Sequence, residues 1–115
     1  MIAYMNGQKI KIIAKEGLFE LIENREDFIL VEVLSKESYD AGHLPMAINI
    51  PVDKIQDMAP TQLPDKQKLI VVYCSDFLCT ASTGATRLLQ SMGYVNVVDY
   101  KGGKDDWSKA GLPLI

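Results

Sequence analysis

The sequence predicts a single α/β domain, residues 1–115, with a mainly parallel sheet. Segments typical of strands and of helices alternate along the chain, a pattern that favours parallel strands joined by helices. No repeat, low-complexity tract or flexible linker interrupts them. A length of 115 residues suits one domain, and 48% hydrophobic with 23% charged residues is ordinary for a globular protein.

The first segments alternate between helix and strand. Residues 17–23 place Leu18, Leu21 and Ile22 on one helical face. Residues 28–33 form an apolar run of strand length. Ser35 is placed to cap a brief helix through about residue 41, which the glycine that follows ends.

The middle of the chain is less regular. Residues 47–50 predict a short strand ended by Pro51, and residues 52–58 predict a helical turn or two. Residues 58–65 carry two prolines, which predict a turn-rich connection.

The second half contains the clearest elements. Residues 69–73 are continuously apolar and rich in β-branched side chains, as in a strand covered on both faces. Residues 80–92 predict a helix with one apolar stripe, which Gly93 ends. Residues 95–98 predict a further strand, and residues 104–110 a last short helix.

Charge and composition argue against several classes of function. The net charge is −3 and there is no long basic stripe, so we expect no nucleic-acid partner. No apolar run reaches the roughly 18 residues of a membrane span, and no signal peptide is visible, so we expect a cytoplasmic protein with reduced cysteines. Two cysteines and one histidine are too few for a structural zinc site. We expect neither a metal nor a cofactor.

A strand, a loop and a helix follow one another around Cys74. Ligands of open α/β sheets bind beyond the carboxyl ends of the strands, and a loop returning to a helix N-terminus directs amide groups at one point. A cysteine there should have a lowered pKa and act as a nucleophile. The alternative is a small buried cysteine that only completes the strand, and these residues alone leave both interpretations open.

Two stretches resemble the rhodanese family. Residues 30–51 are similar to its strand ending in Asp-Val-Arg, a short helix, Gly-His-Ile-Pro-Gly-Ala and Asn-Ile-Pro. Residues 72–113 are similar to its Tyr-Cys loop, Gly-Tyr, Asn-Val, Gly-Gly, Trp and Gly-Leu-Pro. The resemblance implies a three-layer fold with a mainly parallel five-stranded sheet flanked by helices.

The same resemblance implies a sulfurtransferase. Cys74 matches the catalytic cysteine, which takes a sulfane sulfur from a donor, holds it as a persulfide and passes it to a nucleophilic acceptor. The loop amides would stabilise the persulfide anion. The substrate-binding loop would comprise Ser75, Asp76, Phe77, Leu78, Cys79 and Thr80. The expected partner is a small sulfur donor or a persulfide-carrying protein; the oligomeric state is left open.

The chain departs from the family pattern in its charges. Ser75 and Cys79 stand where thiosulfate-using members have arginines, and Asp76 adds a negative charge, so we expect thiosulfate to be a poor donor. Leu34 and Ser38 replace an arginine and a glutamate, so we expect an ion pair of the family to be absent.

Two other functions are weighed against the sulfurtransferase. One is a non-catalytic or redox-sensing rhodanese-like module that uses Cys74 and Cys79. The other, a phosphatase, is rejected because its loop needs an arginine where Thr80 stands. Cys79 leaves two interpretations: it resolves Cys74, by a disulfide or by release of hydrosulfide after sulfur loading, or it only packs under the loop. A disulfide requires Cα atoms within about 7 Å, and side chains of such a loop tend to point outward, so we expect Cys79 to face away from Cys74 unless the loop remodels.

Three further side chains leave a structural and a functional interpretation. Phe77 and Leu78 either tuck against neighbouring loops or form a hydrophobic rim that docks a protein or an apolar thiol. His43, the one histidine, is expected to be a packed residue rather than a general base, because an ionised Cys74 needs none.

Overall fold

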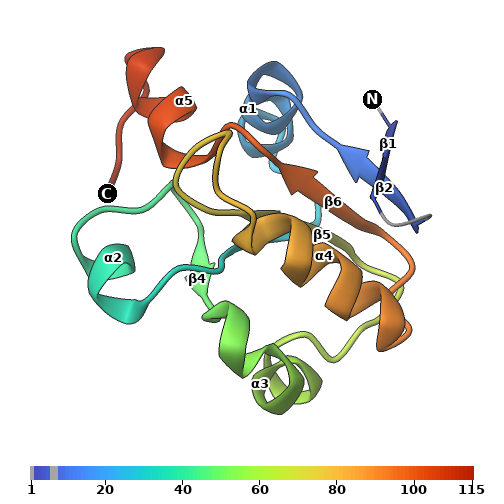
Figure 1. Ribbon diagram of the computed structural model, residues 1–115. Helices are drawn as coiled ribbons and strands as arrows, with labels where there is room; N and C mark the ends of the chain where they lie inside the picture. Colours follow the sequence, from blue (N-terminus) through green and yellow to red (C-terminus); the bar gives the residue numbers. More distant parts are fainter. Residues whose placement is uncertain (1, 6–7) are drawn as a thin grey trace.

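The protein contains one sheet with helices on both faces (Figure 1). The computed structural model describes residues 2–5 and 8–115. Within these residues, six strands lie in the order β1-β2-β6-β5-β3-β4. The strands are β1 (Ile2–Met5), β2 (Gln8–Ile12), β3 (Phe28–Glu32), β4 (Ile48–Asn49), β5 (Leu69–Tyr73) and β6 (Val97–Tyr100). Strands β2 to β6 pair in parallel, which confirms the predicted mainly parallel five-stranded sheet, and β1 adds a sixth strand that is antiparallel to β2.

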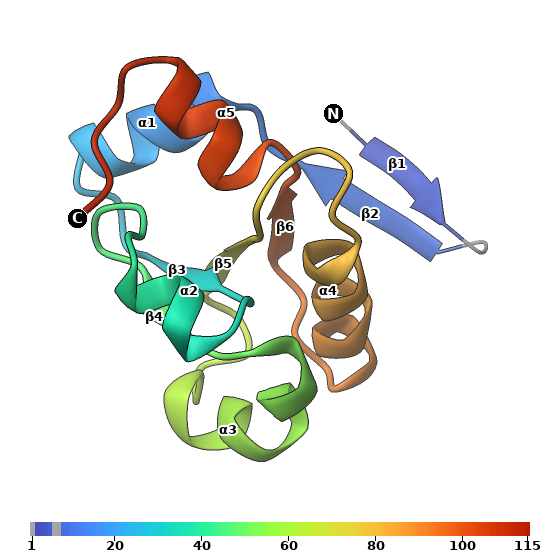
Figure 2. The ribbon, with the colours of Figure 1, turned by 60° about the vertical axis from the view of Figure 1, so that its left-hand side comes forward.

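The helices form two layers, one on each face of the sheet (Figure 2). They are α1 (Lys15–Glu23), α2 (Lys36–Asp40), α3 (Ile55–Gln62), which the 3₁₀ turn η1 (Val52–Lys54) precedes, α4 (Ala81–Ser91) and α5 (Gly103–Lys109). Helices α3 and α4 cover one face, and α1 and α5 cover the other. This confirms the three-layer α/β fold. No helix in the described part combines the length and apolar character needed to cross a membrane.

Strand β5 is the centre of the core. Ile70 and Val72 pack toward α3 and α4, whereas Val71 and Tyr73 pack toward α1 and α5, and all four side chains are fully buried. Since successive side chains of a strand point to opposite faces, a strand buried on both faces has to be apolar throughout. The prediction from its sequence is confirmed.

Strand β6 begins two residues later than predicted. Pairing with β5 sets Val97 opposite Ile70 and Tyr100 opposite Tyr73, while Val95 lies outside the strand and is 63% exposed. The ends of β6 are therefore set by its hydrogen-bonded pairing with β5 and not by the apolar run at residues 95–98. One consequence is that Asp99 lies inside the sheet, fully buried.

Helix α3 extends further than predicted and includes Pro60. Ile55, Ala59 and Leu63, each four residues after the last, are buried on one side of the helix. The Tyr94 hydroxyl donates to the carbonyls of Ala59 and Leu63 at 3.2 and 2.6 Å. Pro60 lies on the exposed side, where water can solvate the carbonyl that its missing N–H leaves unbonded. The predicted turn-rich connection is therefore wrong for residues 58–62, which are helical, and the connection begins at Leu63.

The β1–β2 hairpin was not predicted from the sequence. Lys9-Ile10-Lys11-Ile12 alternates polar and apolar residues, and Asn6-Gly7 is a dipeptide typical of two-residue hairpins, so both signals are present in the sequence. Strand β2 pairs in parallel with β6 through Lys11 and Ile12. It completes the carboxyl edge of the sheet beside the candidate site.

Candidate active site

Cys74 lies at the carboxyl end of β5 and is 1% exposed. Residues 75–80 form the loop that leads into α4, with Thr80 at the N-cap. The sulfur atoms of Cys74 and Cys79 are joined in a disulfide, and the two Cα atoms are 6.5 Å apart. The expectation that Cys79 faces away from Cys74 is therefore wrong.

Asp76 turns the loop inward. Its Oδ1 accepts hydrogen bonds from the amides of Leu78 at 2.9 Å and Cys79 at 3.1 Å, and its carbonyl also accepts from the Cys79 amide at 3.1 Å. This local turn brings the Cys79 side chain toward the sheet. It also occupies two amides that were expected to face the sulfur of Cys74, which corrects that expectation.

Helix α5 fixes the other end of the loop. The amides of Lys104 and Asp105 donate to the carbonyls of Cys74 at 3.1 Å and Ser75 at 2.8 Å. A Cβ atom on Gly103 would lie 2.4 Å from the Cys74 carbonyl oxygen, and this glycine has a φ of +64°. Only glycine fits both conditions, so the Gly102-Gly103 pair lets α5 approach the cysteine.

Polar groups lie behind the cysteine, between β6 and α4. Ser82 Oγ is 3.4 Å from Cys74 Sγ, and the Thr83 hydroxyl donates to Asp99 Oδ2 at 2.9 Å. Burial raises the pKa of Asp99, while the Ser82 and Thr83 hydroxyls and the Lys101 charge lower it. This polar network was not predicted, because the prediction for α4 considered only its apolar stripe. The isolated Asp99 in the apolar run Val97–Tyr100 was its sequence signal.

Lys101 brings a positive charge to the loop from the end of β6. Its ammonium donates to the Cys79 carbonyl at 3.3 Å and to the Thr83 hydroxyl at 3.2 Å. The loop has no arginine of its own, as the sequence shows, but the fold places a cation against its last turn.

A second network connects β3, α2 and α5 across the opposite face. The fully buried Glu32 carboxylate accepts from the Tyr73 hydroxyl at 2.8 Å and pairs with the Lys104 ammonium at 3.1 Å. Lys104 also donates to the Ser38 carbonyl at 2.6 Å. Burial raises the pKa of Tyr73, and Glu32 adds to that shift. Lys104, whose side chain is 15% exposed, therefore supplies a cation where Leu34 and Ser38 offer no ion pair.

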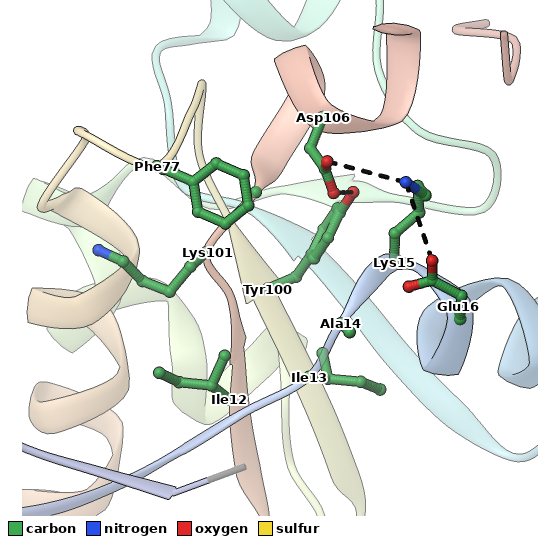
Figure 3. A pocket seen from close by; sticks show the side chains of 10 residues that line it. Ile12, Ile13, Ala14, Lys15, Glu16, Phe77, Tyr100, Lys101 and Asp106 are labelled. Carbon is green, nitrogen blue, oxygen red and sulfur yellow. Dashed lines mark hydrogen bonds and ion pairs between the residues drawn. The ribbon is translucent and has the colours of Figure 1, made fainter. Parts of the chain in front are cut away.

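A pocket of about 500 Å³ opens beside the loop (Figure 3). Ile12, Ile13, Tyr100 and Phe77 form much of its wall, and Lys101 points away toward the loop. At the far side, Asp106 accepts from the Tyr100 hydroxyl at 2.8 Å. Burial and the neighbouring Asp106 raise the pKa of Tyr100. Of the described loop residues, Phe77 alone lines the pocket.

The exposed loop tip agrees with a hydrophobic rim. Leu78 is 91% exposed, and Phe77 is 62% exposed at the edge of the pocket, so most of the surface of both side chains faces solvent. His43 stacks on Tyr39 with ring centres 3.9 Å apart, and its Nδ1 lies 3.1 Å from the Tyr39 carbonyl. It is packed, as predicted.

The fold and the site together define an α/β protein with a strand-end cysteine loop. The family described as Rhodanese-like domain matches residues 16–110. The chain belongs to the rhodanese-like domain family.

Three known proteins illustrate the similarity. The HTH-type transcriptional regulator Rv0324 of Mycobacterium tuberculosis is 36% identical over 97 residues, which are 83% of this chain and 42% of that protein. Thiosulfate sulfurtransferase PspE of Escherichia coli is 35% identical over 75 residues, 65% of this chain and 70% of PspE. The crystal structure of BH2092 from Bacillus halodurans superposes with a TM-score of 0.83 at 29% identity, covering 91% of this chain and 76% of that one.

The extent of these matches differs between relatives. The chain spans between 20% and 42% of the length of the first four curated relatives. In those proteins the region similar to this chain is part of a larger whole.

Proposed function

We propose that this protein is a sulfurtransferase that carries a sulfane sulfur on Cys74 as a persulfide. The observation that carries the proposal is the place of Cys74: buried at the end of β5, under a loop that enters α4, with the Ser82 hydroxyl 3.4 Å from its sulfur. Membership of the rhodanese-like family and the similarity to PspE support it.

The reaction starts from the reduced protein, because the disulfide occupies the nucleophile. A dithiol reductant converts Cys74 and Cys79 to thiols. The Cys74 thiolate then attacks the outer sulfur of the donor, and the electron pair of the broken bond leaves with the rest of the donor, which for thiosulfate is sulfite. A nucleophilic acceptor next attacks the outer sulfur of the persulfide, and Cys74 leaves as a thiolate.

The loop charges argue for a donor other than free thiosulfate. Asp76 places a carboxylate on the loop, and Lys101 is the neighbouring cation, already hydrogen-bonded to Cys79 and Thr83. The exposed Phe77 and Leu78 offer an apolar surface for a persulfide-carrying protein or an apolar thiol. The proposal places this chemistry in the cytoplasm, where dithiol reductants are available.

A redox-sensing module is the second candidate, and the Cys74–Cys79 disulfide favours it. In that function the loop switches between dithiol and disulfide and transfers no sulfur.

Intact-mass measurement separates the two. The reduced protein, Cys74→Ser and Cys79→Ser are each exposed to thiosulfate and to a low-molecular-weight organic persulfide. A sulfurtransferase gains one sulfur in Cys79→Ser and none in Cys74→Ser. Mass changes limited to the two hydrogens of disulfide formation, with no sulfur gained by Cys79→Ser, would establish the redox module instead.

A further inference from the structure

The sulfur of Cys79 is held in bonding reach of the proposed nucleophile, to which the disulfide joins it. Cys79 follows Cys74 by five positions in the chain. It is partly buried and packs against the part of the core that α3 and α4 cover. The sulfurtransferase reaction above uses Cys74 alone. A second cysteine at this point therefore needs a role of its own.

Both ends of the loop are fixed by hydrogen bonds. The α5 amides hold the carbonyls of Cys74 and Ser75, and Asp76 holds the amide of Cys79. Lys101 holds the Cys79 carbonyl at 3.3 Å. The backbone on both sides of the disulfide is thus tied to neighbouring groups. A thiol tethered in this way competes with thiols in solution through a high effective concentration.

We propose that Cys79 discharges the Cys74 persulfide as hydrosulfide; this inference rests on the proposed function. The Cys79 thiolate attacks Cys74 Sγ, the inner sulfur of the persulfide. The bond between Sγ and the outer sulfur breaks, and its electron pair leaves with that outer sulfur. The one proton shared by Cys79 and the persulfide departs with it as HS⁻, and the Cys74–Cys79 disulfide forms.

The geometry selects the inner sulfur as the point of attack. The disulfide joins Cys79 to Cys74 Sγ itself, so the fold already accommodates the product of this step. A dithiol reductant then returns both cysteines to thiols and is itself oxidised to a disulfide, which closes the cycle. The further activity is the release of sulfide from a sulfane-sulfur donor at the expense of a dithiol.

A single-turnover experiment tests the step. The protein is reduced, freed of reductant without air, and mixed with thiosulfate or with an organic persulfide. Sulfide release and intact mass are followed together for the parent, Cys79→Ser and Cys79→Ala. Ser108→Ala, a change at an exposed position of α5, serves as the matched control. No reductant is present, because it would release sulfide from any persulfide.

The parent and Ser108→Ala are expected to release one sulfide per chain and to end two hydrogens lighter. Both Cys79 variants are expected to keep one added sulfur and to release sulfide at least about tenfold more slowly. If the parent also keeps the sulfur, or the Cys79 variants release it equally fast, Cys79 is not the resolving thiol, while the proposed function stands. If no Cys79 variant gains sulfur from either donor, the persulfide itself is refuted and both proposals fail.

Discussion

Asp99 lies in β6, Cys74 directly follows the neighbouring strand β5, and both lie under α4. Asp99 is opposite Val72 in the β5–β6 ladder, and Thr83 of α4 donates to its carboxylate. A carboxylate with no exposed surface is unfavourable in its charged form, and hydrogen bonds offset only part of that penalty. The protein retains it beside the loop, where it helps to hold Thr83 and Lys101.

The stability of the protein should therefore depend on pH through Asp99. Its pKa in the folded state is raised above the ordinary 3.8, so its favourable contribution is complete below about pH 4 and is lost as the pH rises through the raised value. Asp99→Asn does not titrate, so its Tm relative to the parent should increase with pH. Thermal unfolding between about pH 4 and pH 8 measures this, and a constant difference would contradict it.

Asp76 has two effects on the loop that substitutions can separate. Its carboxylate accepts two amides and also adds a negative charge. Asp76→Asn retains an acceptor oxygen without the charge, so the apparent KM for thiosulfate should fall, by less than tenfold for a charge contact of about 1 kcal/mol. Asp76→Ala loses the acceptor as well. Steady-state kinetics of the reduced proteins give the comparison, and an unchanged KM in Asp76→Asn would show that the charge does not act on the donor.

At the scale of elements, α5 positions the cysteine. Its first amides bind the carbonyls of Cys74 and Ser75, and Gly103 permits the approach. The helix begins where β6 ends, so β5 and β6 are linked at their carboxyl ends through α5 as well as through the ladder.

Gly103→Ala should move α5 away from the loop. The new Cβ would meet the Cys74 carbonyl at 2.4 Å, in a backbone conformation that L residues rarely adopt. We expect a loss of about 2 to 4 kcal/mol in the free energy of unfolding.

Two other glycines separate the causes of that loss. Gly111→Ala shares a positive φ, +81°, with no neighbour within 4 Å, and should cost about 1 kcal/mol. Gly84→Ala, in α4 and equally open, should stabilise by about 0.5 to 1 kcal/mol. Chemical denaturation of the three variants gives the order, and equal losses in Gly103→Ala and Gly111→Ala would show that the close contact is unimportant.

At the scale of the whole molecule, the ion pair of Glu32 and Lys104 joins β3 to α5 across the α1–α5 face. Glu32 has no exposed surface; the Tyr73 hydroxyl donates to one oxygen of its carboxylate, and the Lys104 ammonium pairs with the other. A buried charge that loses its partner is strongly destabilising, whereas removing both charges together has a smaller effect.

Lys104→Met should therefore lower the free energy of unfolding by about 3 kcal/mol. Adding Glu32→Gln, which keeps an acceptor for Tyr73, should recover most of that loss. A double-mutant cycle by urea denaturation measures the coupling. If the changes in the free energy of unfolding caused by the two substitutions simply add, there is no coupling energy between Glu32 and Lys104, and the ion pair is not stabilising.

The local pattern of residues was enough for most of the elements. Three signals depend only on residues nearby in the chain: the continuous apolar run of β5, the Ser35 cap of α2 and the glycine after α4. The Ser35 hydroxyl, for example, accepts from the Ser38 amide at 3.2 Å. Such local preferences are visible in a single sequence. The place of Cys74 could be predicted for the same reason, since a strand end and the following helix mark its position, and its role as the nucleophile stays a prediction.

The tertiary structure alone decided how the site is assembled. Nothing in the sequence distinguishes Lys101 and Lys104 from the other lysines. In the fold, the end of β6 brings Lys101 to the loop, and α5 brings Lys104 to the buried carboxylate of Glu32. The ends of β6 depend on pairing with β5, and the direction of Cys79 depends on how the Asp76 side chain turns within the loop, a local choice that residue type leaves open. These features arise from contacts between segments distant in the chain or from the orientation of single side chains. Hydrophobic periodicity and residue type specify which face is buried, and they carry no information on which distant groups meet there.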